Sequence, residues 1–194
     1  MTILGLMGPA GCGKDTIFEF LKEYGYKRAA SADTMKEDLS RYLNLSMSDI
    51  DYYKDKDLGI MYSNMVGDVP LSNFSIRTFL QEYGMDLRNQ FGTDYWINRS
   101  VTEKLKEHIE KEEIKLVITD VRFQNEIDYI HKRGGKVAFI KGRSSLIGKH
   151  KEHISEEMAN RNDIENLVDF TINNSGTLKQ LKEQIDETID FISS

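Results

Sequence analysis

The stretch GPAGCGKDT, residues 8–16, combines closely spaced glycines with a lysine, a pattern typical of a loop that binds phosphate. Glycines let successive backbone N–H groups curl around phosphate oxygens, and the lysine adds a full positive charge. Gly8, Gly13 and Lys14 satisfy the pattern G-x-x-x-x-G-K-[ST], but Asp15 stands where a hydroxyl usually helps to hold magnesium. The chemistry expected here is the binding of a nucleotide polyphosphate.

Asp15 would lie in the first turn of the helix that follows this loop, and its carboxylate has two interpretations. A negative charge there is favoured by the positive end of the helix dipole and would only stabilise the fold. Alternatively, Thr16 supplies a hydroxyl to the phosphates, so that Asp15 is free to face a metal ion, its waters or a phosphate acceptor. These residues alone leave both interpretations open.

A second group of polar residues follows the apolar run in LVITDVRFQNE. Asp120 lies at the carboxyl end of this expected strand, the edge at which open α/β sheets bind ligands. An aspartate in this position usually orients magnesium through water, and Arg122 would project from the same edge toward phosphate. Glu126, one helical turn beyond Phe123, is a candidate contact to a sugar or base. The alternative is a strand end capped by Asp120, with Arg122 in a surface ion pair.

A third group lies in IRTFLQEYGMDLRNQFGTDYW, where Arg77, Gln81 and Gly84 follow one another at i, i+4 and i+7. This spacing puts them on one face if the helix extends that far. A cation, an amide and a position without a side chain suit a phosphate, a base edge and a close backbone approach. A solvated polar face beside an apolar core stripe is the alternative, and Trp96, the only tryptophan, is more often a core residue than a stacking platform.

Strands and helices must alternate along the chain to position these groups. Short apolar runs predict strands at residues 2–7, 26–30, 115–119, 136–140 and 168–172. Apolar residues at helical spacing predict a helix that opens at the glycine loop and stops at Gly25, and further helices at 32–43, 75–91, 95–111, 123–133 and 177–192. This alternation indicates an α/β fold with a parallel sheet of about five strands.

The composition favours a single domain over residues 1–194, because 39% hydrophobic content can build one well-packed core. A net charge of -6 argues against a sequence-independent nucleic-acid binder, which relies on a basic face. The only cysteine, Cys12, excludes an intrachain disulfide and favours the cytoplasm. The apolar runs are too short for a signal peptide or a membrane span. Residues 44–73 and 142–162 are polar stretches that we predict to be mobile segments over a site.

Taken together, these motifs resemble the deoxynucleoside monophosphate kinases of bacteriophages, in the phosphate-loop nucleoside monophosphate kinase-like group. The resemblance is carried by the segments GKDT, ADTMK, RTFLQEYGMDLR, TDVRFQNE, HISEE and INNSGTLKQL, which span most of the chain. It implies a three-layer α/β phosphate-loop fold with a short lid. An aspartate after the loop lysine is normal in that group, whereas Met85 stands where threonine is frequent and Cys12 where serine is common.

The resemblance also implies site residues on the donor side. The ATP phosphates would be cradled by Gly8, Gly11, Cys12, Gly13, Lys14, Asp15 and Thr16. Lys14 would follow the γ-phosphoryl group, with Asp15 and Thr16 around magnesium and the acceptor. Arg143 and the HISEE segment resemble a flap that closes over the transferring group. Asn174 and Thr177 belong to a turn expected beneath adenine.

On the acceptor side, the resemblance implies a deoxynucleoside monophosphate site. Its expected residues are Arg77, Gln81, Gly84, Asp86, Trp96, Asp120, Arg122 and Glu126. Thr16 and Asp120 are the candidate magnesium contacts, and Lys14, Asp15, Arg122 and Arg143 are the candidate catalytic residues.

The predicted function is therefore magnesium-assisted transfer of the γ-phosphoryl group of ATP to a deoxynucleoside 5′-monophosphate. Positioning and charge neutralisation supply most of the acceleration in such reactions. One alternative is a kinase of the same architecture that acts on phosphomevalonate or dephospho-coenzyme A, and another is a DNA-associated ATPase or nucleotide switch. We expect neither a nucleic-acid nor a membrane partner, and a homodimer is an open alternative to a monomer.

Overall fold

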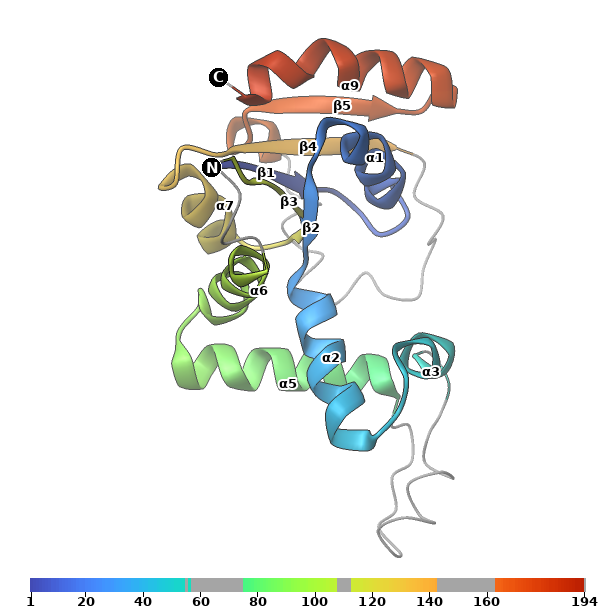
Figure 1. Ribbon diagram of the computed structural model, residues 1–194, viewed down its shortest axis with the longest axis vertical. Helices are drawn as coiled ribbons and strands as arrows, with labels where there is room; N and C mark the ends of the chain where they lie inside the picture. Colours follow the sequence, from blue (N-terminus) through green and yellow to red (C-terminus); the bar gives the residue numbers. More distant parts are fainter. Residues whose placement is uncertain (55, 57–74, 108–112, 143–162, 194) are drawn as a thin grey trace, which may run out of the picture. The chain divides into compact units, whose positions relative to one another are not determined.

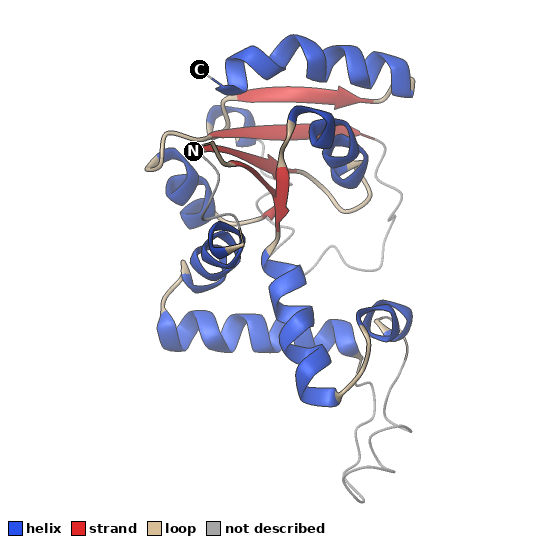
Figure 2. Ribbon diagram, in the orientation of Figure 1, coloured by secondary structure: helices blue, strands red, loops and turns tan. Residues whose placement is uncertain are grey.

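The computed structural model describes residues 1–54, 56, 75–107, 113–142 and 163–193. The chain divides into two compact units, one formed by Met1–Ala30 with Ser100–Ser194 and the other by Ser31–Arg99. The first unit contains the strands, and the second is helical in its described part (Figure 2). The predicted mobile segments at 44–73 and 142–162 lie largely outside the described residues, and the prediction of one kinase domain stays a prediction.

A five-stranded sheet forms the centre of the first unit (Figure 1). Its strands are β1 (Thr2–Met7), β2 (Lys27–Ala29), β3 (Lys115–Val121), β4 (Lys136–Gly142) and β5 (Phe170–Asn174). Their order is β2-β3-β1-β4-β5, and every neighbouring pair is parallel. The predicted parallel α/β sheet is confirmed. Because the strands run in the same direction, the segments that follow them leave the sheet at one edge.

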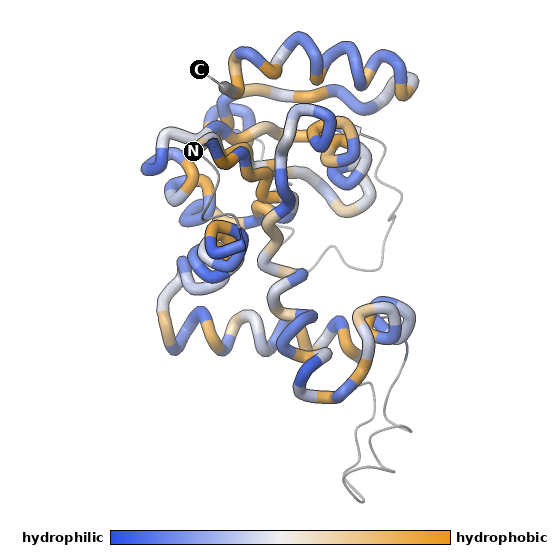
Figure 3. Tube along the Cα trace, viewed as in Figure 1, coloured by the Kyte–Doolittle hydropathy of each residue, from blue (hydrophilic) through white to orange (hydrophobic). Residues whose placement is uncertain are grey.

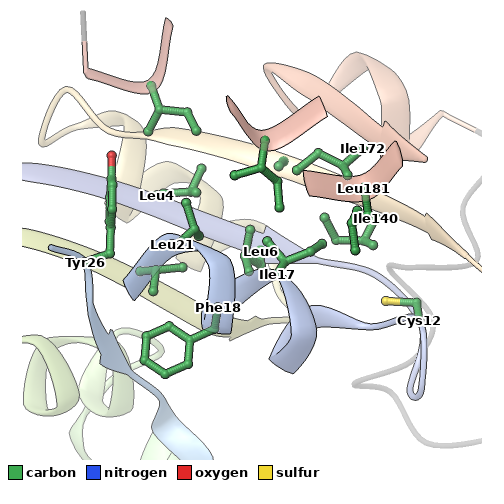
Figure 4. Packing of buried hydrophobic residues seen from close by; sticks show 14 residues of the cluster. Leu4, Leu6, Cys12, Ile17, Phe18, Leu21, Tyr26, Ile140, Ile172 and Leu181 are labelled. Atoms are coloured by element: carbon green, nitrogen blue, oxygen red, sulfur yellow. The ribbon is translucent and has the colours of Figure 1, made fainter. Parts of the chain in front are cut away.

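Helices cover both faces of this sheet, as near-continuous buried strands require. On one face, α1 (Lys14–Leu21) and α9 (Leu178–Ser193) pack against residues that alternate along the strands (Figure 4). Figure 3 shows hydrophobic and hydrophilic residues alternating along α9, as expected for a helix with one buried stripe. On the other face, α7 (Gln124–His131) packs against β1 and β4. The unit therefore has the predicted three layers.

The second unit is built from α2 (Ser31–Leu43), α3 (Met47–Tyr53), α5 (Ile76–Phe91) and the first residues of α6 (Tyr95–Lys106). Its core cluster consists of Leu39, Ile50, Ile76 and Leu80. The helical period of the sequence did not predict α3, which has only seven residues. A capping box starts it: Ser46 Oγ accepts from the Asp49 N–H, and the Asp49 carboxylate accepts from the Ser46 N–H.

Most predicted boundaries agree with the structure to within two or three residues. β3 and β4 each extend two residues further than predicted, and β5 begins two residues later. α1 passes into a short 3₁₀ turn, Lys22–Tyr24, before it stops at Gly25 as predicted. α6 ends at Lys106, and the rest of the helix predicted there lies mostly outside the described residues. None of the described helices has both the length and the apolar character that crossing a bilayer requires.

Candidate active site

The loop between β1 and α1 has the backbone geometry of a phosphate cradle. Gly8, Gly11 and Gly13 all have positive φ angles, of 153°, 76° and 101°. A Cβ at Gly13 would overlap Nδ2 of Asn174, so this position has room for no side chain. The chain can therefore turn sharply there, as a loop that binds an anion at a helix N-terminus requires.

Lys14 lies over this loop with its ammonium against the loop backbone. Its Nζ donates to the carbonyl oxygens of Gly8, at 2.7 Å, and Pro9, at 3.0 Å, and lies 3.6 Å from Sγ of Cys12. The ammonium is therefore held against the backbone at the start of the loop. Since these contacts are to neutral groups, the full charge of Lys14 remains available to an anionic ligand.

Cys12 packs into the core at the end of the sheet and is 1% exposed (Figure 4). Burial raises the pKa of its thiol above the usual value, while the nearby Lys14 ammonium acts in the opposite direction. The net direction is upward, so the thiol is neutral at physiological pH. Cys12 therefore does not cancel the positive charge of Lys14.

Asn174, at the end of β5, contacts the loop between β1 and α1. Its Nδ2 donates to the carbonyl oxygen of Cys12 at 2.9 Å. The end of β4 also supports the loop, because a Cβ at Gly142 would come within 2.6 Å of the same oxygen. Thr177 has a different local role: its N–H and Oγ1 both contact Oε1 of Gln180, which caps the start of α9. The predicted nucleotide contacts of Asn174 and Thr177 stay predictions.

The first turn of α1 carries the acidic residue that departs from the loop pattern. Oδ1 of Asp15 lies 3.0 Å from Nη1 of Arg28 on β2, an ion pair that was not predicted from the sequence. Thr16 is half-buried in the same turn. The Asp15 carboxylate therefore has two positive neighbours. One is the helix N-terminus, which its position implied, and the other is the Arg28 guanidinium from the edge strand.

The carboxyl end of β3 bears the second predicted group. Asp120 is the penultimate residue of the strand, and both Asp120 and Arg122 are half-buried at the edge where the loop begins. Glu126 is 3% exposed, and its Oε2 accepts from the N–H groups of Arg122, at 2.7 Å, and Phe123, at 3.1 Å. The carboxylate therefore shapes the strand-to-helix turn that carries Arg122. The predicted contact of Glu126 to a sugar or base stays a prediction. In the structure, its carboxylate already accepts from two backbone N–H groups.

Replacing Glu126 with alanine is expected to destabilise the protein by about 1–3 kcal/mol for each buried donor that it leaves unsatisfied. The measurement is urea unfolding. Asp128→Ala is the matched control on the same helix, because Asp128 is exposed and accepts only from a neighbouring glutamine side chain among its described hydrogen bonds. The control should change stability by less than about 0.5 kcal/mol. Wild-type stability in Glu126→Ala would contradict the proposed support of the turn.

A magnesium ion fits these residues only as a partner of phosphate. Within the described parts of the chain, no group of three or more His, Cys, Asp or Glu side chains could hold a metal ion. Magnesium typically keeps several waters and binds one or two protein oxygens together with substrate phosphates. The half-buried Asp120 carboxylate and the Thr16 hydroxyl are donors of that kind.

In the second unit, α5 runs unbroken from Ile76 to Phe91, so Arg77, Gln81 and Gly84 do share one helix face. Arg77 and Gln81 are half-buried and Gly84 is buried, while Asp86 is exposed. A Cβ at Gly84 would lie 3.1 Å from Sδ of Met35, so the small residue permits the close approach of α2. The face continues to Arg88, only 8% exposed, which was given no role from the sequence although the same period points to it.

Trp96 is fully buried, and its Nε1 donates to the carbonyl oxygen of Gly84 at 2.9 Å. This residue therefore anchors α6 on α5, as the core interpretation predicted.

The Asp38 carboxylate of α2 is the centre of a polar network. Arg99 forms two hydrogen bonds of 2.5 Å with it, and the Tyr83 hydroxyl donates to it at 3.2 Å. Burial, followed by the Asp38 charge, raises the pKa of Tyr83, so the hydroxyl remains a donor. This network joins α2, α5 and α6.

Arg143 and the HISEE segment lie outside the described residues, so their predicted flap stays a prediction.

Arg28 is a residue of the candidate site that was not predicted from the sequence, although the sequence contained a signal for it. The strand period of two places it on the same face as Tyr26, which packs in the core that includes α1. An arginine on that face was therefore a candidate contact for α1.

The sheet order and the glycine loop that opens α1 define a class of protein: the chain has the fold of the phosphate-loop kinases. A solved dephospho-CoA kinase from Campylobacter jejuni shares it at 16% identity and a TM-score of 0.51, over 98% of this chain and 96% of that chain. The protein TT1252 from Thermus thermophilus shares it at 16% identity and a TM-score of 0.52, over 100% and 98% of the two chains. The chain belongs to the deoxynucleotide monophosphate kinase family, whose sequence model matches residues 52–185.

Membership in this family makes the chain a nucleotide kinase. The matched segment contains α5, β3 and β5 and the residues Arg77, Arg122 and Asn174, but it begins after the glycine loop. At 16% identity the likeness to the solved structures shows the fold alone. None of the curated proteins matches the sequence.

Proposed function

We propose that this protein transfers the γ-phosphoryl group of ATP to a deoxynucleoside 5′-monophosphate, with magnesium. The observation that supports this most directly is the loop around Lys14, in a chain whose family is that of the deoxynucleotide monophosphate kinases. The loop offers a binding site for a polyphosphate, and the family supplies the class of acceptor. Little covalent chemistry is needed from the protein, because phosphoryl transfer is accelerated by positioning and by charge.

On the donor side, backbone N–H groups of the glycine loop bind the phosphates of ATP, and Lys14 moves from the loop carbonyls to the phosphate oxygens. Asn174 and Gly142 keep the loop in shape, since both lie against the carbonyl oxygen of Cys12. Magnesium, when bound, neutralises charge on the phosphates. Thr16 and Asp120 are the residues that would hold it.

On the acceptor side, Arg122 of the first unit binds the phosphate of the monophosphate. For Arg77 and Gln81, on α5 of the second unit, contacts to a phosphate and to the edge of a base stay predictions from the sequence. Gly84 and Trp96 contribute indirectly in this proposal, because their contacts fix the helix that carries Arg77 and Gln81. Asp86 is exposed on the same helix and is a weaker candidate for a substrate contact. Arg143 completes the catalytic set as a predicted flap residue.

A panel of acceptors tests this proposal. ADP release should be measured with each deoxynucleoside and ribonucleoside monophosphate, with dephospho-coenzyme A, with phosphomevalonate, and with DNA and no small acceptor. Turnover that requires a deoxynucleoside monophosphate is the expected result. Turnover only with another small acceptor would overturn the proposed substrate, and turnover stimulated by DNA would favour an ATPase instead.

Replacing Arg122 with alanine is expected to raise the KM for the acceptor about 10- to 150-fold, because a charge-assisted phosphate contact contributes about 1.5–3 kcal/mol. The KM for ATP should change little. Steady-state kinetics in both substrates provide the measurement. Arg133→Ala, an exposed arginine at the other end of α7, is the matched control and should leave the acceptor KM unchanged. A wild-type acceptor KM in Arg122→Ala would remove Arg122 from the site.

A further inference from the structure

We propose that Arg28 is a positioning residue that neutralises Asp15 beside the phosphate loop, so that the loop keeps a net positive charge for its polyphosphate ligand. This inference rests on the proposed function, since it takes the loop as the binder of nucleotide phosphates. It explains how a carboxylate can follow the loop lysine directly.

The contact itself is specific. Nη1 of Arg28 lies 3.0 Å from Oδ1 of Asp15, the distance of a charge-assisted hydrogen bond. Both residues are on rigid elements of the same unit, Asp15 in the first turn of α1 and Arg28 in the middle of β2. The strand holds the guanidinium in place through its parallel pairing with β3, in which Arg28 lies opposite Val117. The position of the charge is therefore set by the sheet.

The exposure of the two side chains indicates that stability is not the purpose of this pair. The Asp15 side chain is 82% exposed and that of Arg28 is 35% exposed. An ion pair with so exposed a partner adds little to the stability of a fold. The pair can still affect a ligand at the adjacent loop, because the positive charge of Arg28 offsets the repulsion between the Asp15 carboxylate and a bound phosphate.

The balance of charge at the loop then follows. Lys14 contacts only neutral groups among its described partners, and the Cys12 thiol is uncharged because burial raises its pKa. Asp15 alone would offset the charge of Lys14 and repel phosphate. With Arg28 paired to Asp15, the positive charge of Lys14 and the helix N-terminus act on the ligand without that opposition.

The experiment is a double-mutant cycle read by the binding of ADP without magnesium, measured by calorimetry at low salt. Arg28→Gln should weaken ADP binding about 5-fold, since it leaves the Asp15 charge beside the phosphates. Asp15→Asn should strengthen binding by a similar factor. The double variant should bind ADP more tightly than Arg28→Gln and within about 2-fold of the wild type, because the net charge of the two positions is zero in both proteins. Arg28→Lys should bind nearly as the wild type does.

Three outcomes would overturn the inference. An unchanged ADP affinity in Arg28→Gln would show that the pair does not act on the loop. A loss in the double variant as large as in Arg28→Gln would show that Arg28 acts on the ligand or the fold directly, and not through Asp15. If Arg28→Gln does not fold, then weakened binding in a folded Arg28→Lys would also count against it. Wild-type protein that fails to bind ADP would instead overturn the proposed function itself.

Discussion

Replacing Lys14 with methionine is expected to lower turnover at least about 10²-fold, which is the scale on which one preorganised electrostatic group contributes to a transition state. Methionine keeps an unbranched chain of similar length and removes only the charge and its donors. Within the protein, the substitution removes the hydrogen bonds from Nζ to Gly8 and Pro9, so stability should fall by no more than about 0.5–1.5 kcal/mol per hydrogen bond. Single-turnover kinetics and thermal unfolding measure the two effects separately.

The matched control is Lys22→Met, which removes a lysine just beyond the end of the same helix. Lys22 pairs with Glu19 at 2.7 Å, and both side chains are at least half exposed. This variant should keep wild-type turnover, because exposed pairs contribute little and the residue is at the opposite end of α1 from the loop. Turnover within a few-fold of wild type in Lys14→Met would mean that the loop lysine does not follow the transferring group.

Replacing Gly13 with alanine is expected to abolish most nucleotide binding, with ADP affinity at least about 10-fold weaker. A residue with a side chain is strained at a φ of 101°, at a cost of about 1–3 kcal/mol. The new methyl group would also overlap Nδ2 of Asn174 and break its hydrogen bond to the carbonyl oxygen of Cys12. Both effects distort the backbone whose N–H groups we propose to bind phosphate. Calorimetry with ADP and a thermal unfolding curve are the measurements.

Gly25→Ala separates strain from distortion of the loop. Gly25 also has a positive φ, of 83°, but a Cβ there would meet nothing within 4 Å. The control should therefore lose stability while it retains ADP affinity. The double variant Gly13→Ala with Asn174→Ala removes the overlap with the Asn174 side chain but keeps the strained φ angle. Its ADP affinity should lie between those of Gly13→Ala and the wild type. Normal ADP affinity in Gly13→Ala would contradict the assigned role of the loop.

The regular elements were largely predictable because their signals are local. β1 was predicted from Thr2 to Met7 and lies there, since a strand buried on both faces is a short apolar run next to a turn. α5 was predicted because its apolar residues return with the helical period over four turns. α3 was not, because seven residues hold too few repeats to define a period. Its capping box was the signal that could have been used.

For the candidate site, the sequence predicted which residues are involved better than it predicted what each of them contacts. The sequence selected Glu126 as a candidate contact to a sugar or base, but only the structure shows its carboxylate bound to the backbone N–H groups of Arg122 and Phe123. Likewise Gly84 was selected for a close approach, and the approaching group proved to be Met35 of α2. A period gives the face of an element, whereas the partner on that face depends on the tertiary arrangement.

By itself, the sequence determined the glycine loop before α1, the parallel α/β class and the face of α5 that Arg77, Gln81 and Gly84 share, because each rests on spacing within a few turns or one strand. The tertiary structure alone decided which distant residues meet the loop. Asn174 binds the carbonyl oxygen of Cys12 across 162 positions of the chain, and Arg28 reaches Asp15 from the edge strand. The physical reason is the parallel sheet, which gathers the ends of strands at one edge in an order that no local pattern encodes.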